Sequence, residues 1–495
     1  MEWEMKTSKA IVVGAGIGGI ATAIRLAVKG FEVEVHEKNE VAGGKLYLIE
    51  KDGFSFDAGP SLFTQPANVE ELFLLAGEDI SNYFTYEPVS IACRYFFENG
   101  KRLDAFTNPQ AFAAEMQEAV GEPAEHVLQY LRDAEQVYEK VGTIFLNHSL
   151  HQRATWLHKR VVDALRTVKF PYLFKTLDGF NRSRFITPEA VQVFNRFATY
   201  NGSNPFSAPG MLSLIPHLEQ NQGTYYPHGG MINIPNALIA LAEKKGVRFV
   251  LNSHVEQIVT AEGRATGIIT NGNFVPADAV ISNVDAYFTY KKLLSDEQGA
   301  KKVLRNERSS SALIFYWGMK REFPELHLHN ILFSASFEKE FDCLFKEKKF
   351  HDDPTIYINI SSKMEKGNAP EGKENWFVMV NAPAMEAADW GMETARLRKN
   401  IVMKLNRMLG ADIEQDMLVE EVLTPGGIQS RTDSYLGSLY GTSSNSKWAA
   451  FLRHANFTSK TNGLYFTGGS VHPGGGIPLC LKSAAIVSDL MGNPA

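Results

Sequence analysis

Three glycines near the start of the chain have a spacing that can hold phosphate groups. Gly14, Gly16 and Gly19 form the pattern G-x-G-x-x-G. In this pattern the first glycine makes a tight turn, the second lets a pyrophosphate approach the backbone, and the third lets a helix pack on a strand. Glu37 follows Gly19 by eighteen positions, where an acid accepts hydrogen bonds from an adenosine ribose and repels a 2′-phosphate. The glycines alone are weak evidence, but with Glu37 they predict a dinucleotide site.

The elements that must position these residues follow from hydrophobic patterns. The apolar run 10–13 predicts a buried parallel strand, and a helical pattern begins directly after it. The run 32–36 predicts a second strand that ends just before Glu37. A helix that starts at the glycines would direct its first backbone amides toward the phosphates.

A second glycine group indicates which dinucleotide binds. Gly43, Gly44 and Lys45 precede the sequence Asp57-Ala-Gly-Pro60 by about a dozen residues. This arrangement resembles the extended flavin fingerprint of the amine-oxidase and carotenoid-desaturase superfamily. The resemblance implies that the cofactor is FAD and that Gly44 and Lys45 contact its ribityl-phosphate side. Lysine stands where many members have arginine, which keeps the positive charge but changes the contact geometry.

The C-terminal region contains another glycine-rich junction. A predicted strand at 464–467 leads into five glycines between positions 468 and 476, and a helix is predicted at 479–490. So many glycines at a strand-to-helix junction indicate close approach of the backbone to another group. The start of this helix would stabilise negative charge on a reduced flavin. The resemblance implies that Gly469 and Ile477 contact the flavin and that Val255 contacts the adenine.

Composition narrows the functional class. The chain has 495 residues, enough for two or three domains, and its net charge of −6 argues against a general affinity for nucleic acid. The three cysteines lie far apart, which is typical of a reducing cytoplasm. His327, His329 and His351 lack ligand partners at metal spacing, so we expect packing or surface roles and no metal site. No apolar run is long enough to cross a bilayer.

One segment reverses the negative charge of the chain. Between positions 153 and 184, eight Lys or Arg residues accompany two Asp residues, and apolar residues recur at helical spacing. A basic amphipathic helix with aromatics is typical of a membrane-surface dock, and the alternative is a cap helix whose apolar face belongs to the core. We expect anionic lipid to bind Lys159, Arg160, Arg166 and Lys169, with Trp156 or Phe174 inserted at the interface.

The order of predicted elements indicates an α/β protein. Strand patterns return at 247–251 and 278–283 after a long interruption, so the domain that binds FAD is discontinuous. We predict a Rossmann-like FAD-binding domain, a mixed-sheet substrate domain, and a helical, membrane-facing subdomain. Their predicted ranges are 1–65 with 220–290 and 455–495, 66–142 with 291–454, and 143–219.

Motifs along the whole chain strengthen the family resemblance. They are Asn204-Pro-Phe, Tyr226-Pro-x-Gly-Gly230, Asp278-Ala-Val-Ile-Ser-Asn283, Tyr435-x-Gly-Ser438 and His472-Pro-Gly-x-Gly-Ile-Pro478. In this order they resemble the phytoene-desaturase-type carotenoid desaturases of bacteria and fungi, and the overall texture is most similar to 1-hydroxycarotenoid 3,4-desaturases. His228 stands where arginine is common in the family.

The resemblance implies an enzyme that introduces a double bond into an acyclic carotenoid end group by hydride transfer to FAD. It also implies peripheral binding to the inner face of the cell membrane from the cytoplasm, with oxygen or a quinone as electron acceptor. His228 and Glu219 are the candidate bases, and a turn-capping role for His228 is equally open. The alternatives are a carotenoid isomerase that uses reduced FAD, a phytoene or diapophytoene desaturase, an amine oxidase, and a binding module with the prenyl-protein escort fold.

Overall fold

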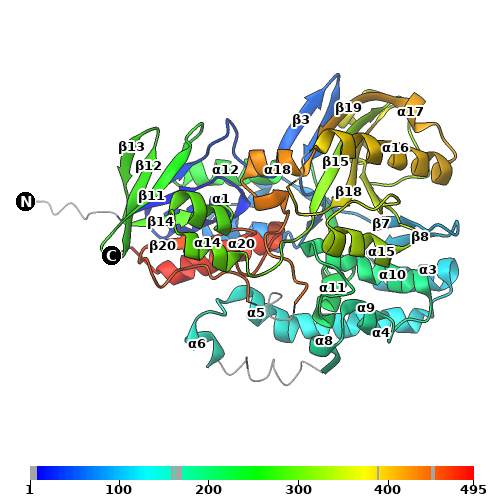
Figure 1. Ribbon diagram of the computed structural model, residues 1–495, viewed down its shortest axis with the longest axis horizontal. Helices are drawn as coiled ribbons and strands as arrows, with labels where there is room; N and C mark the ends of the chain where they lie inside the picture. Colours follow the sequence, from blue (N-terminus) through cyan, green and yellow to red (C-terminus); the bar gives the residue numbers. More distant parts are fainter. Residues whose placement is uncertain (1–7, 158–160, 162–169, 387–388, 447–451, 495) are drawn as a thin grey trace, which may run out of the picture.

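A parallel sheet forms the base of the nucleotide-binding part of the molecule, at the left of Figure 1. The computed structural model describes residues 8–157, 161, 170–386, 389–446 and 452–494. Within them, strands far apart in sequence pair in parallel in the order β10-β2-β1-β14-β20. Their bounds are β1 Lys9–Val13, β2 Glu32–His36, β10 Arg248–Val250, β14 Ala279–Ser282 and β20 Leu464–Phe466.

Both faces of this sheet are covered, which explains why its strands are apolar throughout. Successive β1 side chains point to opposite faces: Ala10 and Val12 pack in one hydrophobic cluster, and Ile11 and Val13 pack in another. The first face carries helices α1 Ile17–Val28, α12 Asn233–Lys244 and α20 Ile477–Met491. The second carries α13 Ala286–Phe288, α14 Glu297–Val303 and an antiparallel sheet of β11 Val255–Ala261, β12 Arg264–Thr270 and β13 Asn273–Pro276.

A mixed sheet forms the other half of the molecule, at the right of Figure 1. Its order is β19-β15-β18-β17-β16-β7-β8, and β16 pairs with β7 in parallel while the other neighbours are antiparallel. Helix α16 (Trp390–Leu409) packs on one face through Leu397, Ile401 and Leu405. The strands are β7 Ile91–Phe96, β8 Arg102–Phe106, β15 Ser311–Met319, β16 His329–Leu332, β17 Ile356–Asn359, β18 Glu374–Ala382 and β19 Met417–Leu423.

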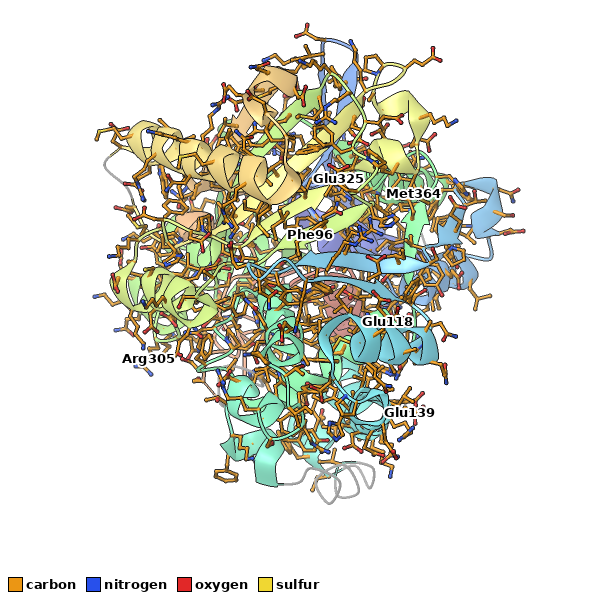
Figure 2. All side chains as sticks on the ribbon, turned by 90° about the vertical axis from the view of Figure 1, so that its right-hand side faces the viewer. Phe96, Glu118, Glu139, Arg305, Glu325 and Met364 are labelled. Carbon is orange, nitrogen blue, oxygen red and sulfur yellow. The ribbon has the colours of Figure 1, made fainter. Side chains whose placement is uncertain are left out.

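A layer of helices lies below the mixed sheet and shares one hydrophobic cluster with β7 and β8. Figure 2 shows Glu118, on α3, at the surface of this layer beneath the sheet. The helices of this layer are α3 Pro109–Val120, α4 Ala124–Val137, α8 Phe170–Phe174, α9 Leu177–Asn181, α10 Pro188–Arg196 and α11 Ile215–Gln220. The short helices α5 Thr143–Asn147 and α6 Arg153–Trp156 lie to their left in Figure 1, beneath the nucleotide-binding half, where α5 contacts α20.

Short elements connect the two halves. The hairpin of β3 and β4 packs against β15 and β18, and β9 pairs with both β5 and β6. The remaining bounds are β3 Tyr47–Lys51, β4 Phe54–Ala58, β5 Phe63–Thr64, β6 Tyr86–Pro88, β9 Thr224–Pro227, α2 Ala67–Leu75, α15 Phe337–Asp342, α17 Ile413–Asp416 and α18 Pro425–Thr432.

The α/β architecture predicted from the sequence is confirmed, with a parallel sheet assembled from three separate parts of the chain. The domain boundaries remain a prediction. Among the described residues, no helix is both long enough and apolar enough to cross a membrane. The four basic residues predicted to bind lipid, Lys159, Arg160, Arg166 and Lys169, lie outside the described residues.

Candidate active site

The two glycine groups lie side by side at the carboxyl ends of β1 and β2. The Gly43 N–H donates to the Ala15 carbonyl at 2.8 Å, and Gly14, with φ of +96°, donates its N–H to the His36 carbonyl at 2.8 Å. A Cβ added at Gly44 would lie 2.9 Å from the Gly16 Cα. The packing at these glycines leaves no room for side chains. Backbone amides can therefore approach a pyrophosphate directly, and these glycines form the cradle that it requires.

Gly19 has a different place from the other fingerprint glycines. It lies inside α1, where an added Cβ would come 2.2 Å from the Gly14 carbonyl oxygen. Gly19 therefore sets the distance between helix and turn, while Gly14, Gly16 and Gly44 line the cavity described below.

Glu37 is held at the end of β2 by backbone and side-chain donors. The Ala15 N–H donates to Glu37 Oε2 at 2.8 Å, and the Asn39 backbone N–H and side-chain amide donate to Oε1 at 3.0 and 2.6 Å. The side chain is buried from solvent yet lines the cavity. Oε1 accepts two hydrogen bonds and Oε2 accepts one, so Oε2 keeps a lone pair for a ribose hydroxyl group.

Lys45 carries a positive charge into the same cavity. Its Nζ donates to the Leu439 carbonyl at 2.6 Å. Removal from bulk water lowers the pKa of this ammonium group to about 8, although Cys480 and Asp285 oppose the shift. Because the Lys45 ammonium group is poorly solvated and lies beside Gly44, an anionic ligand bound there would stabilise its charge.

The other predicted cofactor contacts also border this cavity. Val255, Gly469 and Ile477 are lining residues, and Ile477 begins α20. The fingerprint glycines, Glu37, Lys45 and these three residues come from both ends and the middle of the chain, and the parallel sheet brings them together.

The cavity continues from the dinucleotide edge to the mixed sheet. Its wall there is apolar and comes mostly from strands β15, β16, β18 and β19. The lining side chains include Ile314, Ile331, Phe337, Phe377, Met379 and Leu423. One space therefore joins a nucleotide cradle to a hydrophobic wall.

A buried ion pair interrupts this wall. Arg196, at the end of α10, donates through Nη2 to both oxygens of Glu219 at 3.2 Å and to the Tyr95 hydroxyl at 2.6 Å. Glu219 also accepts from the Tyr200 hydroxyl and from the Gln220 amide. Arg196 is 8% exposed and Glu219 is 1% exposed, yet both line the cavity.

A second polar group lies nearby on the sheet. The Tyr357 hydroxyl makes hydrogen bonds with Ser61 Oγ at 2.7 Å and with His329 Nδ1 at 2.8 Å. Burial, with a smaller contribution from the Arg196 charge, lowers the pKa of His329 to about 3, so its imidazole is neutral at physiological pH. His329 lies inside the cavity wall rather than on the surface.

The two candidate bases occupy different places. Glu219 lines the cavity, whereas His228 is exposed on a turn and is absent from the described cavity lining. The His228 carbonyl accepts from Asn233 Nδ2 at 2.7 Å, and its N–H donates to the Thr85 carbonyl at 2.9 Å. Both hydrogen bonds use backbone atoms of His228, so the turn-capping role of its side chain stays a prediction. The position of the exposed ring, outside the described cavity lining, argues against a catalytic role.

Comparison with known proteins agrees with this geometry. The family model for flavin containing amine oxidoreductases matches residues 17–491. The chain belongs to this family. FAD is therefore the cofactor, and the glycine cradle, Glu37 and Lys45 fit its pyrophosphate and ribose.

Individual members of the flavin containing amine oxidoreductase family resemble the chain over its whole length. A 1-hydroxycarotenoid 3,4-desaturase of Flavobacterium sp. (strain P99-3) is 47% identical over 98% of this chain and 99% of its own. A 4,4'-diapolycopene oxygenase of Methylomonas sp. is 33% identical over 97% of each chain. A solved oxidoreductase from Methanosarcina mazei has the same fold, with a TM-score of 0.64 at 16% identity over 98% of this chain and 99% of its own.

Sequence reasoning missed several lining residues that the fold brings together. Arg196, Tyr200 and Tyr357 have no motif of their own, and His329 was expected to have only a packing or surface role. The sequence held no clear signal for Arg196, because Gln192 and Glu189 share its face of α10. Among the described residues no group of His, Cys, Asp or Glu could hold a metal ion.

Proposed function

We propose that this protein is an FAD-dependent desaturase that introduces a double bond into the end group of an acyclic carotenoid. The observation that carries the proposal is the single cavity that joins the dinucleotide cradle to the apolar wall of the mixed sheet. A hydrocarbon held against that wall is within the same enclosed space as the cofactor. The similarity to the Flavobacterium enzyme supports 3,4-desaturation of a 1-hydroxycarotenoid as the specific form of the reaction.

The reaction removes a hydride and a proton from adjacent carbons of the substrate. Bound FAD would accept the hydride and, on full reduction, the proton as well, which balances the two hydrogen atoms that the substrate loses. The chain's own residues hold the polyene against Ile314, Ile331 and Phe377 and exclude water from it. Positive charge that develops on the substrate is delocalised along the polyene, so a strong acid is not required. Glu219 is the one candidate base that faces the cavity, but its oxygens already accept hydrogen bonds from three side chains, so we assign it to holding Arg196 in place.

Product mass tests the proposal. Purified protein loaded with FAD should convert a hydroxylated acyclic carotenoid in liposomes to a product lighter by two hydrogen atoms, and the flavin absorbance should bleach when oxygen is excluded. An isomerase would leave the mass unchanged, and an oxygenase would add oxygen. Phytoene and diapophytoene, offered separately, test the alternative hydrocarbon substrates. Amines should not bleach the flavin.

We also propose that the electrons pass on to oxygen or a quinone. The flavin bleached by substrate should recover its absorbance on addition of air or of a soluble quinone under argon. If neither air nor the quinone restores the flavin absorbance, this part of the proposal is wrong.

Peripheral binding to the inner face of the cell membrane is a further part of the proposal. Trp156 and Phe174 are 44% and 56% exposed, and Leu157 is 86% exposed. The helices α6 and α8, which carry the two aromatics, both lie at the lower edge of the molecule in Figure 1, and in the sequence they flank the predicted basic segment. Exposed apolar side chains near a basic segment favour an anionic membrane surface.

Liposome flotation tests this contact. Replacing Lys159, Arg160, Arg166 and Lys169 with glutamate, or Leu157→Gln alone, should weaken binding to anionic liposomes without changing FAD content. The matched control is Leu74→Gln, which alters a leucine that is 79% exposed on α2. Flotation of the quadruple variant at the wild-type level would show that the segment is only a cap on the core.

A further inference from the structure

We propose that Arg196, held in place by Glu219, binds the hydroxyl group of the substrate end group and thereby selects hydroxylated carotenoids over the parent hydrocarbons. The inference rests on the proposed function and adds the residues that recognise the oxygen atom. The observation behind it is that a charged pair faces a cavity whose other walls suit a hydrocarbon.

Arg196 is rigidly held but has a donor to spare. It uses Nη2 for Glu219 and Tyr95, and its Nε is sealed inside the protein, while Nη1 is not sealed and makes no hydrogen bond with the described residues. The guanidinium carbon lies 5.3, 4.7 and 5.1 Å from the ring centres of Tyr95, Phe197 and Tyr200. These rings fix the guanidinium, so a donor directed at a ligand loses little entropy on binding.

A pure hydrocarbon would leave this pair unsatisfied. Burial of an ion pair is costly, and its unused donors and acceptors must find partners to recover that cost. A polyene has neither donor nor acceptor. A hydroxyl group offers two acceptor lone pairs, so it can accept from Arg196 Nη1. Glu219, whose oxygens already accept four hydrogen bonds, holds the guanidinium group in place.

The position of the pair suits a hydroxyl close to the reacting bond. In a 1-hydroxycarotenoid oxidised at the 3,4 bond, the oxygen lies within about 5 Å of the reacting carbons, because each bond spans about 1.5 Å. The pair lines the same cavity as the cofactor cradle. Tyr357, which makes hydrogen bonds with His329 and Ser61, lines the wall of that cavity too.

Substrate preference tests the inference. The assay compares kcat/KM of the FAD-loaded protein for a hydroxylated acyclic carotenoid and for the hydrocarbon of the same chain length, both in liposomes. Sites built to hydrogen-bond a hydroxyl reject the analogue without it strongly, so we expect a preference of at least about 100-fold. In the double variant Arg196→Met with Glu219→Gln, which removes both charges together, the preference should fall to about 10-fold or less, through slower turnover of the hydroxylated substrate.

A matched pair of changes controls for the loss of a buried salt bridge. Arg94 and Asp104 form a buried pair at 2.6 Å between neighbouring strands of the same sheet, and neither is among the lining residues. Arg94→Met with Asp104→Asn should keep the wild-type preference. If the Arg196 and Glu219 double variant does not fold, Tyr200→Phe decides the question. It keeps both charges but removes a hydrogen bond that holds Glu219, and through it the Arg196 donor, in place, so it should lower the preference.

The outcomes separate this inference from the proposed function. Turnover of neither carotenoid by wild-type protein would contradict the proposed function. Turnover of both with equal kcat/KM, or a preference that survives in the folded double variant or in Tyr200→Phe, would overturn the inference while the desaturase function stands.

Discussion

Lys45 is an ammonium group placed where solvation is poor, and its charge depends on what occupies the cavity. Burial lowers the pKa of the free group to about 8, and a nearby phosphate would raise it again. Lys45 then holds its proton more tightly when FAD is bound than when the protein is free of FAD. Above pH 8, FAD binding is therefore accompanied by uptake of a proton.

We therefore expect FAD affinity to be constant below about pH 7 and to fall by up to about tenfold per pH unit above pH 8. Lys45→Met should remove this dependence, and Lys45→Arg should retain high affinity at high pH because arginine stays charged. Quenching of FAD fluorescence during titration measures the Kd. The control is Lys244→Met, which changes an exposed lysine paired with Glu78. A pH dependence that persists in Lys45→Met would show that another group is responsible.

Glu37 provides a second prediction at the scale of one side chain. Its loss should weaken FAD binding by about 1–3 kcal/mol, the value of a hydrogen bond to a charged group. Titration of the apoprotein of Glu37→Gln with FAD measures this change. Glu34→Gln is the matched control, because Glu34 lies on the same strand in ion pairs with Lys9 and Arg248 but does not line the cavity. Equal FAD affinity in the two variants would contradict the placement of the adenosine.

At the scale of elements, α1 has to lie close to the glycine turn that precedes it. An added Cβ at Gly19 would come within 2.2 Å of the Gly14 carbonyl oxygen, and neither backbone can move independently of its sheet or helix. α1 also packs against α12 and α20, so a shift of this helix would disturb the whole face of the parallel sheet.

Gly19→Ala should therefore lower the free energy of unfolding by about 1–3 kcal/mol, the usual cost of overpacking, and should reduce FAD content. Urea denaturation followed by circular dichroism measures the first, and flavin absorbance of the purified protein measures the second. Gly367→Ala is the control, since an added Cβ there would meet nothing within 4 Å. Wild-type stability in Gly19→Ala would show that α1 can shift without cost.

At the scale of the whole molecule, FAD should act as a structural bridge. The cavity it occupies takes lining residues from the N-terminal, central and C-terminal parts of the chain and from the mixed sheet. A ligand that binds the folded state alone stabilises it by an amount set by its concentration relative to Kd.

Removal of FAD should lower Tm, and free FAD at 100 times its Kd should restore about 2.7 kcal/mol of stability. Differential scanning calorimetry of the apoprotein across a series of FAD concentrations measures the effect. Riboflavin, which lacks the phosphates and adenosine, should restore much less because the glycine cradle and Glu37 would stay empty. Equal stabilisation by riboflavin would contradict the proposed contacts.

The amino-acid sequence by itself determined the nucleotide-binding half of the site. Three features of this half depend on local backbone conformation and on side-chain periodicity, which neighbouring residues in the sequence determine. They are the turn at Gly14, the strand that ends at Glu37 and the junction before Ile477. For this reason the predicted strand at 32–36 coincides with β2, and the predicted cofactor residues surround one cavity, with Gly19 packed beneath it.

The residues of the substrate-binding half of the site are brought together only by the tertiary structure. Arg196 and Glu219 are separated by 23 positions, and Tyr95 precedes Arg196 by 101 positions; their meeting depends on how α10 and α11 pack against β7. The same packing separated the two candidate bases, since it buries Glu219 in the cavity and leaves His228 exposed on a turn nine positions later. Long-range packing of this kind has no period or spacing in the sequence, because it depends on the distance between whole elements rather than between neighbouring residues.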